Sequence, residues 1–177
     1  MTTLRLVTTD ELTERDLRQL RALMHLSFPG FFTEEDWMHT LGGRHALVTL
    51  DGLIVAHAAL VERALVAGSE RLNAGYVEGV ATAPDYRNLR HASNAMRAVS
   101  QIIDEEFDLG GLSTGVPGFF ERLGWERWRG QTFVDGPDGR TRTPEDDDGV
   151  MVRRTRRTLD LDATSDLVCE WRRGEVW

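Results

Sequence analysis

Two turn signals in the middle of the chain constrain its fold more than any other feature. Asp51-Gly52 separates an apolar run at 46–50 from a longer one at 53–66, and Gly68-Ser69 separates that run from a third at 72–82. Such pairs are typical of tight hairpin turns, because glycine adopts a positive φ at little steric cost. The three runs are therefore predicted to be consecutive antiparallel strands, which excludes a sheet built only from βαβ units.

Apolar residues recur at helical spacing both before and after these strands. The first such segment runs from Thr13 to about Ser27, and acidic residues occupy its first turn, where the helix dipole favours them. A second, short helix is predicted from Thr33. The third and longest is predicted from Arg87 to about Phe107. Each is expected to bury one apolar face.

The rest of the chain contains shorter elements and one long polar segment. Strands are predicted at 4–7, 112–114, 125–128, 133–134, 150–153 and 166–171, and a short helix at 117–123. Residues 136–148 are polar and contain proline and glycine, so they are predicted to form a surface loop. The element order predicts a single α+β domain over residues 1–177, with a mixed, mostly antiparallel central sheet flanked by helices.

The charge balance and the cysteine count exclude several classes of function. The 177 residues include 29 acidic and 21 basic side chains, which gives a net charge of −8. This surplus argues against a nucleic-acid partner, whose phosphates need a basic surface, and it permits a cationic small molecule. Every basic residue is arginine, which removes lysine Schiff-base chemistry. Cys169 is the only cysteine, so no intrachain disulfide forms.

The sequence predicts no metal site and no membrane segment. The histidines lack the spacing of metal ligands and are interpreted as structural or surface residues, with His57 in a strand. No stretch approaches the ~20 apolar residues that span a bilayer. The N-terminus lacks a basic region followed by an apolar one, so a cytoplasmic protein is expected.

Three motifs lie in or near the predicted strand at 72–82 and the long helix after it. They are Tyr76–Val80, Pro84–Arg87 and Phe119–Trp125, and with them the chain resembles the GNAT superfamily of N-acetyltransferases. The resemblance implies a GNAT-like fold and acetyl-CoA as co-substrate, held where a strand bulge and a helix N-terminus offer free N–H groups. The cofactor-binding residues it implies are Val80, Ala81, Thr82, Arg87, Asn88, Leu89, Arg90, His91 and Ala92.

The start of this helix departs from the family pattern, because no glycine follows Arg87. Backbone donors remain available there, and Arg87 and Arg90 offer charge-assisted contacts to phosphate. Side chains would crowd a phosphate where glycine would not. The alternative interpretation of the segment is a charged helix cap without a ligand.

A closer resemblance covers nearly the whole chain. The segments Phe32–Trp37, His39–Gly43, Gly75–Glu78 and Cys169–Trp177 are similar to those of the aminoglycoside 2′-N-acetyltransferases. The resemblance implies acetylation of an aminoglycoside antibiotic at its 2′-amino group, antibiotic resistance as the outcome, and a homodimer. An acidic protein suits such a substrate, because aminoglycosides are polycations.

The resemblance also implies roles for individual residues. Glu78 would bind the amine and act as base, directly or through water, and the Val80 N–H would polarise the thioester carbonyl. Ser113 would lie beside the path of the nucleophile, so these three are the candidate catalytic residues. The substrate-binding residues are then Phe31, Asp36, Glu78, Gly79, Ser113, Asp147, Glu175 and Trp177, the last through its terminal carboxylate.

Two positions depart from this closer family. Phe120 stands where the family usually has a tyrosine that can protonate the leaving thiolate, and phenylalanine cannot donate a proton. Phe31 stands where the family has an aspartate, so one contact for a cationic amine is missing. A less cationic or differently shaped sugar antibiotic, such as kasugamycin, would fit this change.

Other interpretations remain open from the residues alone. A lone Glu78 in a strand is more often a surface residue than a catalytic one, and the acidic run at 145–148 is more often a solvated loop. A second enzyme class is a GNAT protein that acetylates another small-molecule amine. A non-enzymatic class is a GNAT fold that binds acetyl-CoA or the antibiotic without turnover.

Overall fold

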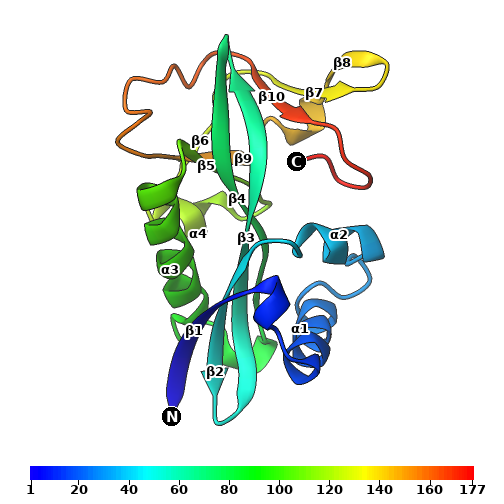
Figure 1. Ribbon diagram of the computed structural model, residues 1–177, viewed down its shortest axis with the longest axis vertical. Coiled ribbons are helices and arrows are strands. Elements are labelled where there is room, and N and C mark those ends of the chain that lie inside the picture. The colour runs from blue at the N-terminus through cyan, green and yellow to red at the C-terminus, as the bar shows by residue number, and fades with distance from the viewer. The chain divides into compact units, whose positions relative to one another are not determined.

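The computed structural model describes residues 1–177, and Figure 1 shows the arrangement of its strands and helices. The strands are β1 (Thr2–Thr8), β2 (Arg44–Leu50), β3 (Leu53–Ala67), β4 (Glu70–Thr82), β5 (Leu109–Ser113), β6 (Glu126–Arg127), β7 (Thr132–Gly136), β8 (Gly139–Arg142), β9 (Val150–Arg154) and β10 (Leu167–Glu170). The helices are α1 (Glu14–Ser27), α2 (Glu34–His39), α3 (His91–Glu106) and α4 (Pro117–Glu121), with 3-10 turns at Thr9–Glu11, Pro84–Tyr86 and Pro144–Asp146.

All strands belong to one sheet of mixed direction. Its order is β6-β9-β5-β4-β3-β10-β7-β8, and β2 pairs with both β1 and β3. The pairs β4–β5 and β7–β10 are parallel, whereas β1–β2, β2–β3, β3–β10, β5–β9, β6–β9 and β7–β8 are antiparallel. The predicted α+β fold with a mixed, mostly antiparallel sheet is therefore confirmed.

The chain forms two compact units, and each is built from two separate stretches. Unit 1 comprises Met1–Val61 and Val77–Val99, and unit 2 comprises Glu62–Tyr76 and Ser100–Trp177. The long strands β3 and β4 contribute to both units.

One core cluster of unit 1 is built on the apolar face of α1. Thr13 caps this helix, because its side chain accepts a hydrogen bond from the Asp16 N–H. The Asp16 side chain in turn accepts a hydrogen bond from the Thr13 N–H, and these two bonds define the start of the helix. Leu20 and Met24 on α1 are fully buried and cluster with Trp37 and Leu47. Each such side chain contributes roughly 1.5–3 kcal/mol by leaving water.

In unit 2 the pairing of β4 with β5 is short. The register joins Ala74 to Leu109 and ends at Tyr76 and Gly111. Both glycines of β5 are required by close packing, because a Cβ at Gly110 would lie 2.9 Å from the Trp125 ring and one at Gly111 would lie 2.8 Å from the Tyr76 ring.

The prediction of a surface loop over residues 136–148 was wrong. Residues 139–142 form β8, which pairs with β7 as a hairpin, and a 3-10 turn follows at Pro144–Asp146. No apolar side chain of β8 is buried, so the strand lacks the hydrophobic pattern that would reveal it. Cross-strand contacts hold it instead: Arg140 makes a bidentate ion pair with Asp135.

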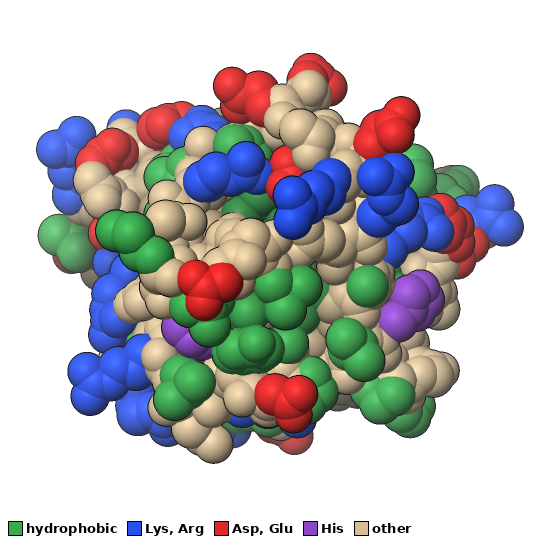
Figure 2. All heavy atoms as spheres, turned by 90° about the horizontal axis from the view of Figure 1, so that it is seen from below, with side chains coloured by type: hydrophobic (Ala, Val, Ile, Leu, Met, Phe, Trp, Pro, Cys, Tyr) green, Lys and Arg blue, Asp and Glu red, His purple; other side chains and the backbone are tan.

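On the face shown in Figure 2, the acidic side chains do not form a patch apart from the basic ones. Acidic and basic side chains are interspersed there around an apolar centre. The net charge of −8 therefore does not produce one continuous acidic surface on that face.

Candidate active site

The strand β4 contains a left-handed glycine between two of the predicted catalytic residues. Gly79 has φ +55°, and a Cβ at this position would lie 2.8 Å from Thr40 Cγ2. Both the conformation and the crowding therefore require glycine. A left-handed glycine inside a strand is typical of a β-bulge, which redirects the neighbouring side chain and N–H groups. Here those neighbours are Glu78 and Val80, both half-buried.

One buried histidine, His57, contacts the backbone at Gly79, and a second buried histidine, His45, contacts His57. His57 Nδ1 lies 2.8 Å from the Gly79 carbonyl oxygen, and His57 Nε2 lies 3.0 Å from His45 Nδ1. Burial lowers the pKa of His57 to about 3, helped by the charge of His45, and burial alone lowers the pKa of His45 to about 4. Both imidazoles are therefore neutral at physiological pH. The sequence identified His57 as a strand residue but not this contact.

The proposed phosphate-binding segment adopts a glycine-like backbone without glycine. The helix α3 begins at His91 and not at Arg87 as predicted, because Asn88 and Arg90 have φ values of +63° and +65°. The first intrahelical bond joins the Asn94 N–H to the Arg90 carbonyl, so the N–H groups before Asn94 have no acceptor within the helix. The side chain of His91 is buried, and its Nδ1 has no hydrogen-bond partner. These features fit an anion.

We expect the backbone at Arg90 to tolerate glycine better than any branched residue. Arg90→Gly should change the free energy of unfolding by less than about 1 kcal/mol, and Arg90→Val should lower it by about 1–2 kcal/mol, because a left-handed φ penalises a branched Cβ. Urea unfolding measures both. The matched control is Arg97→Gly inside α3, which should cost about 1 kcal/mol. Equal losses for the two glycine variants would contradict the left-handed conformation of Arg90.

The segment between α1 and α2 presents an aromatic surface in unit 1. Phe31 is 84% exposed, and the rings of Phe28 and Phe32 stack with centroids 6.0 Å apart. The carboxylate of Asp36 already accepts the Thr33 N–H at 2.8 Å and the Thr33 hydroxyl at 2.9 Å, as the cap of α2. Asp36 therefore has an established role in starting the helix.

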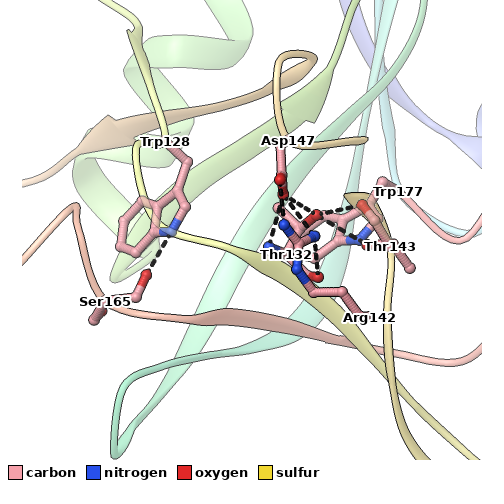
Figure 3. A network of polar contacts seen from close by, with 7 residues as sticks. All are labelled: Trp128, Thr132, Arg142, Thr143, Asp147, Ser165 and Trp177. Carbon is pink, nitrogen blue, oxygen red and sulfur yellow. Dashed lines mark hydrogen bonds and ion pairs between the residues drawn. The ribbon is translucent and has the colours of Figure 1, made fainter. Parts of the chain in front are cut away.

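Among the predicted substrate residues of unit 2, Asp147 is engaged within the fold (Figure 3). Its Oδ1 accepts the Thr132 N–H at 3.0 Å and an Arg142 N–H at 2.9 Å, and Oδ2 forms an ion pair with the same guanidinium. The hydrogen bond from Arg142 is the main reason why the pKa of Asp147 lies below its usual value. Asp147 thus joins β7 to β8 and the turn that follows.

We expect Asp147→Asn to affect stability. The amide keeps the shape but loses the charge that Arg142 and the Thr132 N–H stabilise, so the free energy of unfolding at pH 7 should fall by about 1–2 kcal/mol, allowing for solvent screening. The stabilisation from a depressed pKa is fully present above the unfolded value of 3.8, so the difference from wild type should shrink as pH falls from there through the lower folded pKa. Asp148→Asn, at the exposed neighbour, should change little. A variant as stable as wild type at pH 7 would contradict this role.

The C-terminal segment is anchored in the same unit. The side chain of Trp177 is buried and donates from Nε1 to the Thr143 hydroxyl at 3.0 Å (Figure 3). Arg63, which is 5% exposed, donates to the carbonyls of Val176 and Glu170 and lies 4.7 Å from the centre of the Tyr76 ring. No pattern in the sequence predicts this role for Arg63.

Four further predicted or neighbouring positions complete the description of unit 2. Ser113 is exposed at the end of β5, and Glu175 is exposed in the C-terminal segment. Burial, together with the charges of Glu145 and Glu175, raises the pKa of Asp146 to about 6. Phe120 is buried, and its ring contacts those of Phe119 and Trp125 edge to face.

Neither a membrane helix nor a cluster of metal ligands is found. None of the helices has the length and the apolar composition that crossing a bilayer requires. The structure contains no group of three or more His, Cys, Asp or Glu side chains that could hold a metal ion.

Comparisons with known proteins agree on the family. Residues 8–128 match the model of the acetyltransferase (GNAT) domain. An aminoglycoside 2′-N-acetyltransferase from Mycolicibacterium fortuitum is 40% identical over 99% of this chain and 92% of its own length.

Solved structures agree on the fold. A GNAT family N-acetyltransferase from Escherichia coli in complex with CoA has a TM-score of 0.65 at 17% identity, over 95% of this chain and 89% of that one. A GCN5-related N-acetyltransferase from Kribbella flavida has a TM-score of 0.61 at 25% identity. The match covers 73% of this chain and 34% of the Kribbella protein, so it involves about a third of that longer chain. On these grounds the chain belongs to the GNAT acetyltransferases and, within them, to the family of the aminoglycoside 2′-N-acetyltransferases.

Proposed function

We propose that this acetyltransferase transfers the acetyl group of acetyl-CoA to the 2′-amino group of an aminoglycoside antibiotic and thereby confers resistance. The observation that carries the proposal is the bulge of β4, where a carboxylate at Glu78 and a backbone N–H at Val80 flank the left-handed Gly79. Transfer to an amine needs one group of each kind.

The chemistry follows from the charges. An ammonium ion cannot attack a thioester, so Glu78 accepts a proton from it, directly or through water. The neutral amine then attacks the thioester carbon, and the Val80 N–H donates to the oxyanion that forms. The intermediate collapses with cleavage of the C–S bond. Coenzyme A leaves as its thiolate and takes up the second proton of the attacking nitrogen, so that an amide and a free thiol result. A thiol pKa of about 8.5 makes this departure feasible without a tyrosine at Phe120.

Direct transfer is favoured over an acyl-enzyme. Cys169 is the only cysteine, it is buried, and burial raises its pKa to about 11. A thiol of that pKa is not the nucleophile that an acyl-enzyme requires.

The residues after the bulge fit acetyl-CoA. We propose that Val80, Ala81 and Thr82 lie along the thioester and the pantetheine, and that Arg87 to Ala92 hold the pyrophosphate. The support is the set of N–H groups before Asn94 that have no acceptor within α3, together with the buried, unpartnered Nδ1 of His91. When bound, acetyl-CoA supplies the acetyl group.

The aromatic surface of unit 1 suggests an atypical antibiotic. The exposed Phe31 offers an apolar contact, and Asp36 is already engaged with Thr33. Both features favour a sugar with fewer cationic amines, and we propose kasugamycin as one substrate. The roles of Ser113, Asp147, Glu175 and Trp177 toward the substrate remain predictions.

A thiol-release assay tests the proposal. The panel contains aminoglycosides with a 2′-amine, matched compounds with a 2′-hydroxyl, and kasugamycin, and NMR of the product locates the acetyl group. Turnover restricted to 2′-amines supports the proposal, and turnover of unrelated amines alone supports the broader GNAT function. Tight binding in calorimetry without any turnover would favour a binding protein.

We further propose that the protein acts in the cytoplasm as a homodimer of GNAT-like domains, each formed by both units of one chain. Sedimentation equilibrium at micromolar concentration should give twice the chain mass of 20.0 kDa. A single species at that chain mass would contradict the dimer.

A further inference from the structure

A directed chain of hydrogen bonds runs from the surface of unit 1 to the bulge of β4. The Gly42 N–H donates to Thr9 Oγ1 at 2.8 Å, and Thr9 Oγ1 lies 2.9 Å from His45 Nε2. From there the chain continues through His45 and His57 to the Gly79 carbonyl. Both histidines are 1% exposed, so each polar atom depends on these partners.

The end of this chain fixes the tautomer of each ring. A carbonyl oxygen only accepts hydrogen bonds, so the proton of His57 is on Nδ1. A neutral imidazole then has a bare Nε2, which accepts from His45 Nδ1–H. The remaining nitrogen, His45 Nε2, accepts from the Thr9 hydroxyl. All the bonds therefore point in one direction, toward Gly79.

The register of the sheet explains how the pair is formed. Leu47 on β2 lies opposite His57 on β3, and His45 lies opposite Ala59. His45 and His57 are therefore diagonal neighbours on one face of the β2–β3 pair, within reach of each other's rings. Their ring centroids are 5.3 Å apart.

The same chain cannot relay the proton of the reaction. It ends on a carbonyl oxygen, which holds no proton at neutral pH, and the low pKa values keep both rings neutral. What it can do is hold the Gly79 peptide in one orientation. Because Gly79 lies between Glu78 and Val80, this orientation sets the direction of both groups.

We propose that His57, held in its Nδ1–H tautomer by His45, is a positioning residue that orients Glu78 and the Val80 N–H through the Gly79 carbonyl. The inference rests on the proposed function, in which these two groups act on the amine and the thioester. Misplacement of catalytic groups by about 1 Å is known to cost on the order of 10²-fold in rate.

Two substitutions at His57 separate the effect of its hydrogen-bond donor from the effect of its side-chain volume. His57→Phe keeps an aromatic ring but removes the donor, so kcat should fall about 10- to 100-fold while the KM for acetyl-CoA stays within about threefold. His57→Asn places an amide N–H where Nδ1 was, and it should restore kcat to within a few-fold of wild type. A purely structural role would not produce this rescue. If His57→Phe does not fold, the same comparison can be made at His45, one hydrogen bond farther from Gly79. There His45→Leu removes the donor and His45→Asn replaces it.

NMR tests the inference without any turnover. In ¹⁵N-labelled wild type, His57 should carry its proton on Nδ1, with exposed His25 as the reference signal. The amide resonances of Gly79 and Val80 should move in His57→Phe and return in His57→Asn. If the wild-type protein shows these signals but transfers no acetyl group, the proposed function is wrong and the inferred role of His57 in orienting the Gly79 peptide still holds. A folded His57→Phe with wild-type kcat, an Nε2–H tautomer, or unmoved amides would overturn the positioning role.

Discussion

Glu78→Gln is expected to lower kcat/KM for the aminoglycoside by ~10²- to 10⁴-fold at pH 7.5, which is the range for loss of a general base. The amide keeps the size of the side chain but accepts no proton, so the ammonium group of the substrate stays protonated. Because Glu78 is not one of the proposed pyrophosphate residues, the Kd of coenzyme A should stay within about twofold. Steady-state thiol release and calorimetry give the two quantities.

A matched control lies on the same strand. Glu70 is exposed at the start of β4, and Glu70→Gln makes the same chemical change there. It should leave kcat/KM unaltered. The decisive outcome is a Glu78→Gln enzyme that turns over like wild type, because this would remove Glu78 from the mechanism.

The free energy of unfolding is expected to fall by about 4 kcal/mol between pH 7 and pH 5 as a contribution of His45 and His57. Their folded pKa values are about 4 and about 3, below the unfolded value of 6.5. In this range the unfolded chain therefore binds two protons that the folded chain does not bind. Each proton lowers the free energy of unfolding by about 2 kcal/mol between pH 7 and pH 5. The loss begins near pH 6.5 and continues toward pH 4. Against a total of roughly 5–15 kcal/mol this is a large effect.

Urea unfolding at pH 7, 6 and 5 measures this dependence. Asp146 acts in the opposite sense, because its folded pKa of about 6 exceeds the unfolded 3.8, and it should return about 1 kcal/mol over the same range. The comparison with His45→Gln isolates the histidine contribution, since this variant should lose about half of it. A slope identical to that of wild type would mean that His45 is not buried in its neutral form.

Local signals predicted the elements whose boundaries depend on nearby residues. The hairpin turns at Asp51-Gly52 and Gly68-Ser69 and the capped starts of α1 and α2 occur where the sequence placed them. Each relies on contacts within about four residues, such as the reciprocal bonds of Thr33 and Asp36. Glycine conformation and capping chemistry are encoded locally, which is why they were visible.

Features that depend on distant partners were not visible. The β8 strand has no buried apolar residue, and the ion pair of Arg140 with Asp135 forms only once β7 is beside it. The diagonal contact of His45 and His57 depends on the register of β2 with β3, which shifts between Val48 and Thr49. The left-handed Arg90 also escaped prediction, because glycine is the usual signal for that conformation and is absent here.

The division of β3 and β4 between the two units has a consequence for how such a chain can change during evolution. The polypeptide passes from one unit to the other between residues 61 and 62, 76 and 77, and 99 and 100. No single break yields an intact copy of either unit, so neither can be gained, lost or exchanged by simple gene fusion or truncation. A recombination event that keeps both units intact must therefore transfer the whole stretch from residue 1 to residue 177.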